Sequence, residues 1–335
     1  APLLREAAAN PGNDHRLGAN EAPPAIISVF LGEQLEDVLN QLCEKGEATS
    51  SKKGSQVDVG VSTVPTFMKD ATDRNRTSPF AFTNNKFEFR MVGSSASIAD
   101  ANTVLNTIVA DALGQAADMI EAADNKDMAA HDLTKRWISE HIRIVFNGNG
   151  YSEEWIEEAA RRGLPNINNT VDAHAALSDP KAIALFERHK VMTRNELISR
   201  EEVGYETYAK VINVEARTML DMAKKEILPA VIRYTMTVAK SVNEIEAAGA
   251  KPHVQKRILD QCQAHLSDMY KALDDLEEVT QKAASMETGR AQAGFYRDEV
   301  VRAMEQLRKP ADALEMLVDE KEWPFPTYAD LMFNV

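Results

Sequence analysis

The chain has 335 residues, of which 44% are hydrophobic, and its formal net charge at pH 7 is −14. This length predicts one large domain or two, with enough apolar side chains for a substantial core. A surface this acidic repels phosphate backbones and anionic lipids, so nucleic acids and membranes are poor partners, and solubility is the simplest explanation of the charge.

The two cysteines, Cys43 and Cys262, lie far apart and form no Cys-x-x-Cys pair. This spacing argues against a disulfide framework or a structural zinc site, and it favours a reducing cytoplasm. No apolar run is long enough to span a bilayer, and residues 1–5 show no signal-peptide pattern. The chain also lacks an initiator methionine, which processing or a start inside a longer protein would explain.

Most strand and loop patterns lie in the first 92 residues. Residues 25–31 are apolar on both faces, which predicts a strand that is buried on both sides. Residues 44–55 are rich in Lys, Ser, Gly and Glu, which predicts an exposed loop. Residues 86–91 alternate between apolar and charged side chains, which predicts a strand with one face towards the core.

From about residue 97 onward the pattern becomes helical. The first helix is expected to bury one face, made of Ile98, Ala101, Leu105, Ile108, Ala112 and Leu113. Later helices have recognisable N-caps at Ser152 and at Asp179, which precedes Pro180. Thr193 and Glu196 have the spacing of a capping box.

Two long helical segments follow, at about residues 201–247 and 252–286. Each has an apolar seam, which predicts helices packed as a hairpin or bundle, although a coiled coil that binds a partner is the alternative. The second seam contains Val254, Ile258, Cys262, Leu266, Met269, Leu273 and Leu276. Pro229 lies inside the first segment and should kink or split it.

Charged residues in the strand and loop segments are the best candidates for chemistry. Lys86, Glu88 and Arg90 share one face of the strand at 86–91. Taken alone, this is most simply a solvated face, but Arg16, Glu21 and the segment 73–77 also place Arg and acidic side chains outside helices. Guanidinium groups bind carboxylates and phosphates bidentately, and a carboxylate among them could hold a hard divalent cation. The set suits a polyanionic substrate with a metal.

Several common motifs are absent from the sequence. There is no GxxxxGK[ST] phosphate loop, no GxGxxG motif and no HExxH pair. His131 and His141 lie on an expected helix, where a surface or packing role is simpler than metal binding.

Three segments carry a resemblance to the glutamine synthetase family. Residues 13–23 resemble its Arg-Leu…Glu-Ala-Pro loop, residues 73–80 its Asn-Arg-Ser stretch, and residues 86–90 its Glu-x-Arg strand. The amino-acid sequence of these segments, and of residues 323–328, is similar to that of the type III branch. The resemblance covers essentially the whole chain, whereas the catalytic motifs occupy its first third.

The resemblance implies an α+β fold. Residues 1–122 would form the C-terminal part of the catalytic barrel, with antiparallel strands and helices, and residues 123–335 an α-helical domain specific to the type III branch. In the family, a β-grasp domain and the first half of the barrel precede the Glu-Ala-Pro loop and supply most metal ligands. None of their motifs occurs here, so the chain is expected to be one piece of a longer or split protein and inactive alone.

The implied activity is glutamate–ammonia ligation with ATP and Mg²⁺ or Mn²⁺. ATP would phosphorylate the γ-carboxylate of glutamate, and ammonia would then displace the phosphate. By the resemblance, Glu21 is the flap glutamate that helps to deprotonate ammonium, and Arg76 stabilises the transferring phosphate. Arg16 and Arg90 would contact the substrate glutamate, and Glu88 would be a metal ligand.

The sequence departs from the better-known type I pattern at three places. Lys86 replaces a nucleotide-side arginine, which keeps the charge but loses the bidentate fork. Ala81 aligns with a further arginine, and residues 32–57 form an insertion expected to be a loop.

The family also implies a homo-oligomer of stacked rings with active sites at subunit boundaries. Two other functions remain open from the sequence. One is a non-catalytic helical scaffold or regulatory chain derived from the fold, and the other is a γ-glutamyl ligase that uses an organic amine instead of ammonia.

Overall fold

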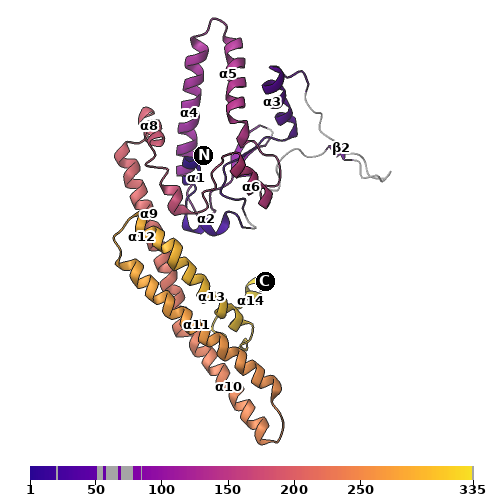
Figure 1. The fold of residues 1–335 in the computed structure, drawn as a ribbon, viewed down its shortest axis with the longest axis vertical. Coiled ribbons are helices and arrows are strands. Elements are labelled where there is room, and N and C mark those ends of the chain that lie inside the picture. The colour runs from indigo at the N-terminus through magenta and orange to yellow at the C-terminus, as the bar shows by residue number, and fades with distance from the viewer. Residues whose placement is uncertain (20–21, 51–55, 58–66, 69–77, 84, 334–335) are drawn as a thin grey trace. The chain divides into compact units, whose positions relative to one another are not determined.

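The computed structural model describes residues 1–19, 22–50, 56–57, 67–68, 78–83 and 85–333. These residues are mostly helical and include two small sheets, and the chain divides into two compact units, Ala1–Glu201 and Glu202–Val335 (Figure 1). Residue 122, the expected end of the catalytic domain, lies in the turn between α4 (Ala99–Glu121) and α5 (Lys126–His141). That domain boundary stays a prediction.

The first unit contains a three-stranded sheet in the order β1-β4-β5. Its strands are β1 (Val29–Phe30), β4 (Phe80–Phe82) and β5 (Phe87–Phe89). β4 and β5 are antiparallel because a short loop joins them, but β1 runs parallel to β4. The expected antiparallel pairing is found between β4 and β5, whereas the parallel pairing of β1 with β4 was not expected. The long connection between β1 and β4, which includes a helix, permits the parallel pairing.

The segment predicted as a buried strand is buried at residues 25–28 and half-buried at 29–31. Only Val29–Phe30 joins the sheet, and Ile26 makes a single bridge to Asn166. The expected loop at 32–57 is half helical, because α3 (Glu33–Lys45) fills its beginning and ends at Gly46, whose φ of 86° favours glycine. Residues 47–50 are exposed, as predicted, and β2 (Gln56–Val57) pairs with β3 (Phe67–Met68).

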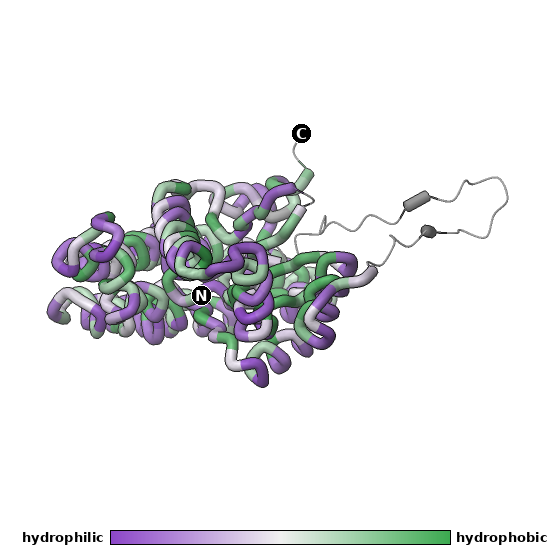
Figure 2. Tube along the Cα trace, turned by 90° about the horizontal axis from the view of Figure 1, so that it is seen from above, coloured by the Kyte–Doolittle hydropathy of each residue, from purple (hydrophilic) through white to green (hydrophobic). Residues whose placement is uncertain are grey.

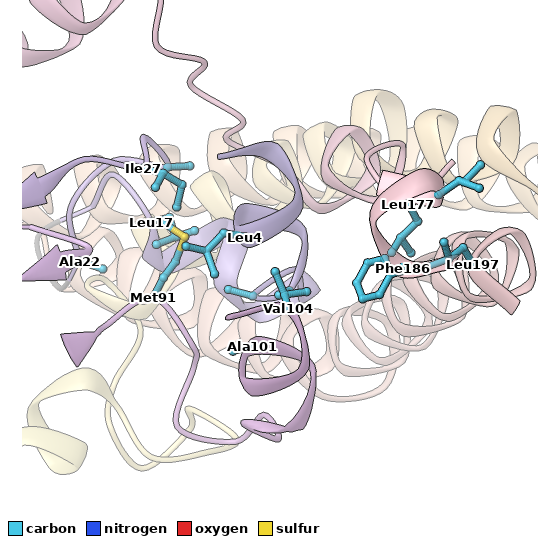
Figure 3. Packing of buried hydrophobic residues seen from close by; sticks show 14 residues of the cluster. Leu4, Leu17, Ala22, Ile27, Met91, Ala101, Val104, Leu177, Phe186 and Leu197 are labelled. Carbon is cyan, nitrogen blue, oxygen red and sulfur yellow. The ribbon is translucent and has the colours of Figure 1, made fainter. Parts of the chain in front are cut away.

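Helices pack around this sheet within the first unit. Beside α3, α4 and α5 they are α1 (Pro2–Glu6), α2 (Pro11–Arg16), a 3₁₀ turn (Ile142–Ile144), α6 (Glu153–Arg161), α7 (Thr170–His174), α8 (Pro180–Arg188) and the start of α9 (Arg194–Met222). The main core joins Leu4, Leu17, Met91, Val104 and Phe186 from five segments of the chain (Figure 3). Burial of these side chains is what fixes α1 and α2 against the end of β5.

The predicted helix caps are confirmed. The Ser152 side chain accepts a hydrogen bond from the Trp155 N–H, and Asp179 accepts one from the Lys181 N–H. Thr193 and Glu196 exchange hydrogen bonds as a capping box at the start of α9. The predicted buried face of α4 is only partly correct. Its middle packs on α1 and α8, whereas Ile98 and Leu113, beyond that contact, are each 65% exposed.

The second unit is built from long helices. They are the rest of α9, α10 (Leu228–Ala247), α11 (His253–Ser285), α12 (Arg290–Phe295), α13 (Val301–Glu315) and α14 (Tyr328–Phe333), with π-helical turns at Ala223–Ile227 and Tyr296–Val300. α11 packs along both α10 and α13 (Figure 1). Hydrophilic and hydrophobic stretches alternate along the helical parts of the chain, as amphipathic packing requires (Figure 2).

Pro229 neither ends nor splits its helix. The π-helical turn Ala223–Ile227 lies just before it, and the Leu228 N–H donates to the Ala223 carbonyl five residues back. Proline cannot donate to the carbonyl four residues earlier, and a π turn is one way in which a helix absorbs that loss. Among the helices that the structure describes, none is both long and apolar enough to cross a membrane.

Candidate active site

Three of the six predicted site residues meet in one pocket of the first unit. Arg16, Glu88 and Arg90 line a cavity of about 470 Å³, together with Ala22, Pro23, Phe89, Val92 and Ser94. Lys86 lies beside them through an ion pair with Glu88. Glu21 and Arg76 fall outside the described residues.

The β5 strand and the residue after it position the charged side chains. Glu88 pairs with Ala81 of β4, and the Arg90 N–H donates to the Pro79 carbonyl at 2.8 Å. Side chains two residues apart on a strand share a face, as the sequence predicted. The Glu88 carboxylate accepts hydrogen bonds from Arg90 Nε at 3.1 Å and Nη2 at 2.9 Å, and it lies 3.0 Å from Lys86 Nζ.

These two cations keep the Glu88 carboxylate ionised. Hydrogen bonds from Lys86 first, and from Arg90 second, lower the pKa of Glu88 below its ordinary value. Arg90 is 14% exposed, whereas Lys86 is 63% exposed, so the arginine is the more firmly enclosed partner. The face therefore presents a carboxylate held between two positive groups.

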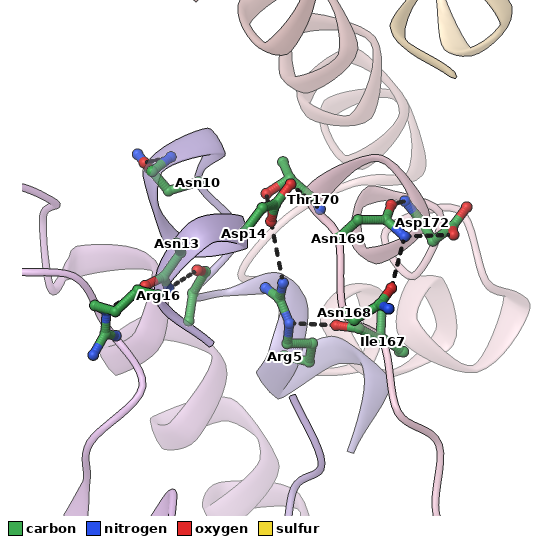
Figure 4. Close-up of polar contacts among 12 residues, drawn as sticks. Arg5, Asn10, Asn13, Asp14, Arg16, Ile167, Asn168, Asn169, Thr170 and Asp172 are labelled. Carbon is green, nitrogen blue, oxygen red and sulfur yellow. Dashed lines mark hydrogen bonds and ion pairs between the residues drawn. The ribbon is translucent and has the colours of Figure 1, made fainter. Parts of the chain in front are cut away.

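Arg16 reaches the same pocket from the last turn of α2. Asn10 caps this short helix by accepting the Gly12 N–H at 2.9 Å. Arg16 Nε donates to Asn13 Oδ1 at 2.8 Å (Figure 4). Its Nη2 donates to the Met91 carbonyl. Because Met91 follows Arg90 directly, the second bond places the Arg16 guanidinium beside the end of β5.

A buried polar group on the other side of α2 was not found from the sequence. Arg5 is 1% exposed and donates to the Ile167 carbonyl at 2.8 Å, with Asp14 at 3.6 Å (Figure 4). Asp14 also accepts from the Thr170 N–H at 2.9 Å and hydroxyl at 2.7 Å. Burial raises the pKa of Asp14 and lowers that of Arg5. The group ties α1 and α2 to α7, and thus holds the helix that carries Arg16.

The donor set fits a divalent metal only in part. Glu88 offers an ionised carboxylate, which is the ligand type that Mg²⁺ and Mn²⁺ prefer. Within the ranges that the structure covers, no three His, Cys, Asp or Glu side chains come together as a metal site. Glu88 can therefore serve as one ligand, since Mg²⁺ binds through one or two protein carboxylates together with substrate phosphates.

Comparison with known proteins bears directly on this pocket and its helices. Residues 129–246 match the glutamine synthetase C-terminal domain. The chain is 38% identical to the type-3 glutamine synthetase of Dictyostelium discoideum over 99% of its own length and 46% of that protein. It is also 38% identical to a glutamine synthetase of Butyrivibrio fibrisolvens, over 100% of this chain and 48% of the relative. It is 34% identical to a glutamine synthetase of Bacteroides fragilis, over 99% of this chain and 47% of the relative.

Together these matches define the class: the chain is a homologue of the glutamine synthetases. More particularly, it corresponds to the C-terminal portion of a type III glutamine synthetase, as its sequence predicted. The chain spans about half the length of the curated relatives that it matches.

Proposed function

We propose that this chain supplies part of the active site of a glutamate–ammonia ligase that uses ATP. The observation that carries the proposal is the pocket in which Arg16, Glu88 and Arg90 meet. It joins two guanidinium groups and an ionised carboxylate from segments far apart in the sequence. The names of the relatives support the same activity.

In this proposal, Arg16 and Arg90 bind the carboxylate of the substrate glutamate. Guanidinium groups can hold a carboxylate with paired hydrogen bonds. Lys86 contributes positive charge on the nucleotide side and keeps Glu88 deprotonated. Glu88 would hold the Mg²⁺ or Mn²⁺ ion, which supplies charge neutralisation for the ATP phosphates when bound.

The remaining two roles belong to residues outside the described ranges. Arg76 would stabilise the phosphoryl group as it moves from ATP to the γ-carboxylate, since phosphoryl transfer depends on positioned cations. Glu21 would accept a proton from ammonium, so that ammonia can attack the acyl phosphate and release phosphate.

The finer architecture is part of the same proposal. Residues 1–122 belong to the catalytic barrel, and residues 123–335 form the helical domain of the type III branch. The protein would assemble as stacked rings in the cytoplasm, with active sites at subunit boundaries.

A non-catalytic scaffold derived from this fold is the second candidate. One observation favours it: the part of the chain that the structure describes contains no group of three potential metal ligands. The pocket disfavours it, because a scaffold has no physical need for Arg16, Glu88 and Arg90 around one cavity.

The proposal is tested on the polypeptide as its source cell makes it. Phosphate release from ATP should require glutamate, ammonia and Mg²⁺ or Mn²⁺ together, with one glutamine formed per phosphate released. Replacement of ammonia by methylamine or ethylamine at equal concentration should give far less product. Faster turnover with the amine would establish the amine ligase instead, and the absence of phosphate release with all substrates present would support the scaffold.

A further inference from the structure

We propose that Asn13 is a positioning residue for Arg16, and that it sets the geometry of the two-arginine pocket. The proposal deepens the proposed function and rests on it, because the ligand that Arg16 would meet is the substrate carboxylate. Asn13 itself does not line the pocket. It acts through the orientation of the Arg16 guanidinium.

The hydrogen-bonding groups of the Asn13 side chain are engaged on both sides of its amide. The side chain is buried, with 3% exposure. Its Nδ2 donates to the Ala8 carbonyl at 2.7 Å and to the Met91 carbonyl at 2.9 Å, while its Oδ1 accepts Arg16 Nε at 2.8 Å. A flipped amide would place its oxygen against two carbonyls and its N–H groups against a guanidinium. The orientation is therefore fixed by the network.

The Met91 carbonyl links this network to the second arginine. It accepts hydrogen bonds from both Asn13 Nδ2 and Arg16 Nη2. Met91 is 1% exposed, and its neighbour Arg90 is tied to Pro79 through the backbone, so this carbonyl is a fixed reference point. Arg16 is thus held to the backbone that carries Arg90, and the spacing of the two guanidinium groups is set before any ligand arrives.

A preset spacing matters for affinity and not only for stability. Arginine has a long, flexible side chain, and ordering it at the moment of binding weakens the complex. Two contacts, one to Asn13 and one to Met91, fix the plane of the Arg16 guanidinium. Loss of Asn13 should consequently weaken glutamate binding while leaving ATP binding nearly unchanged.

A double-mutant cycle tests the coupling between Asn13 and Arg16. It is measured on the enzyme as its source cell makes it. Asn13→Ala is expected to raise the KM for glutamate about tenfold, with the KM for ATP within about twofold of wild type. In an Arg16→Ala background, the same change should alter the glutamate KM by less than about twofold. Additive effects, or equal rises in both KM values, would overturn the proposal.

Asn125→Ala is the matched control, since it removes an asparagine N-cap from α5, a helix that carries none of the pocket residues. It should lower Tm and leave the glutamate KM at the wild-type value. Should Asn13→Ala fail to fold, Asn13→Ser carries the test, because it keeps a small neutral polar side chain at this buried position and loses the amide that joins Arg16 to the two carbonyls. Its glutamate KM should rise by at least about threefold, and a KM equal to that of wild type would contradict the role.

A measurement that needs no catalysis separates this inference from the proposed function. In protein labelled with ¹⁵N-arginine, the Arg16 Nε–H signal, assigned through Arg16→Lys, should exchange slowly with solvent. It should exchange at least about tenfold faster in Asn13→Ala and be unchanged in Asn125→Ala. Unchanged exchange in Asn13→Ala would refute the positioning role, whereas an inactive wild-type enzyme would refute only the proposed function.

Discussion

Glu88 is the residue whose surroundings say most about the site. Its carboxylate accepts hydrogen bonds from Arg90 and forms an ion pair with Lys86, and both interactions lower its pKa. A carboxylate with a lowered folded-state pKa contributes stability at pH values above its ordinary pKa. That contribution is lost as the pH falls through the lowered value.

Replacement of Lys86 should move this titration. Lys86→Met removes the largest cause of the shift, so the pKa of Glu88 should rise towards the ordinary glutamate value. A ¹³C carboxyl titration by NMR would measure it, with Lys251→Met in the other compact unit as the control. An unchanged Glu88 pKa in Lys86→Met would mean that the ion pair does not persist in solution.

The shared face of Lys86, Glu88 and Arg90 could be predicted from the sequence alone, because strand alternation is a local property. The place of Arg16 beside them could not, since nothing local relates α2 to the end of β5. Only the resemblance to a family brought these segments together beforehand. Asn13, Arg5 and Asp14 were missed as a network because their partners are backbone carbonyls and residues about 80 or 150 positions away.

Among the elements, α11 shows how well an apolar seam in the sequence predicts which side chains are buried. Cys262, Met269, Leu273 and Leu276 are buried as the spacing predicted, each with 2% exposure or less. Val254 continues the same pattern but is 66% exposed, in the first turn of the helix. Periodicity identifies the face of a helix, whereas the extent of that face depends on where the neighbouring helices end.

Shortening a side chain should therefore change the free energy of unfolding differently at the two ends of this seam. Leu276→Ala leaves a cavity between packed helices and should lower the free energy of unfolding by about 2–5 kcal/mol. Val254→Ala should change it by less than about 0.5 kcal/mol. Urea unfolding followed by circular dichroism measures both. Equal effects of the two substitutions would show that the packing of α11 differs from the one described.

The capping box of α9 offers a second test at this scale. Thr193→Ala removes the two hydrogen bonds between the Thr193 hydroxyl and Glu196 and should lower the free energy of unfolding by about 1 kcal/mol. Thr218→Ala, an exposed site in the same helix whose hydroxyl donates to the Val214 carbonyl, is the control and should cost much less. If Thr193→Ala lowers the free energy of unfolding no more than Thr218→Ala does, the capping box does not stabilise α9.

The arrangement of the sheet was predicted less well than the helices. Caps and seams depend on residues a few positions apart, so the sequence predicted them directly. Strand pairing depends on which distant segments meet, and the parallel β1–β4 pair was unexpected for this reason. The π-helical turn before Pro229 was also not foreseen, although proline predicted a disturbance at that place.

At the scale of the whole molecule, the chain covers about half the length of its relatives, and the residues that the structure describes contain no group of three potential metal ligands. We expect the 335-residue chain, purified alone, to form no glutamine from ATP, glutamate and ammonia. Glu88 by itself cannot hold the metal ions that phosphoryl transfer requires. Product detection by mass spectrometry would test this, with the polypeptide isolated from its source as the positive control. Glutamine formation by the isolated chain would contradict the expectation.

The central claim is that the pocket around Arg16, Glu88 and Arg90 binds the substrate carboxylate. The most direct measurement is the KM for glutamate of the Arg90→Met variant, in the enzyme as its source cell makes it. The control is Arg297→Met, which removes an arginine from an ion pair in the second unit. The account predicts a rise of at least about tenfold for Arg90→Met, equivalent to about 1.4 kcal/mol, and no change for the control. A glutamate KM that is the same in Arg90→Met as in wild type would contradict it.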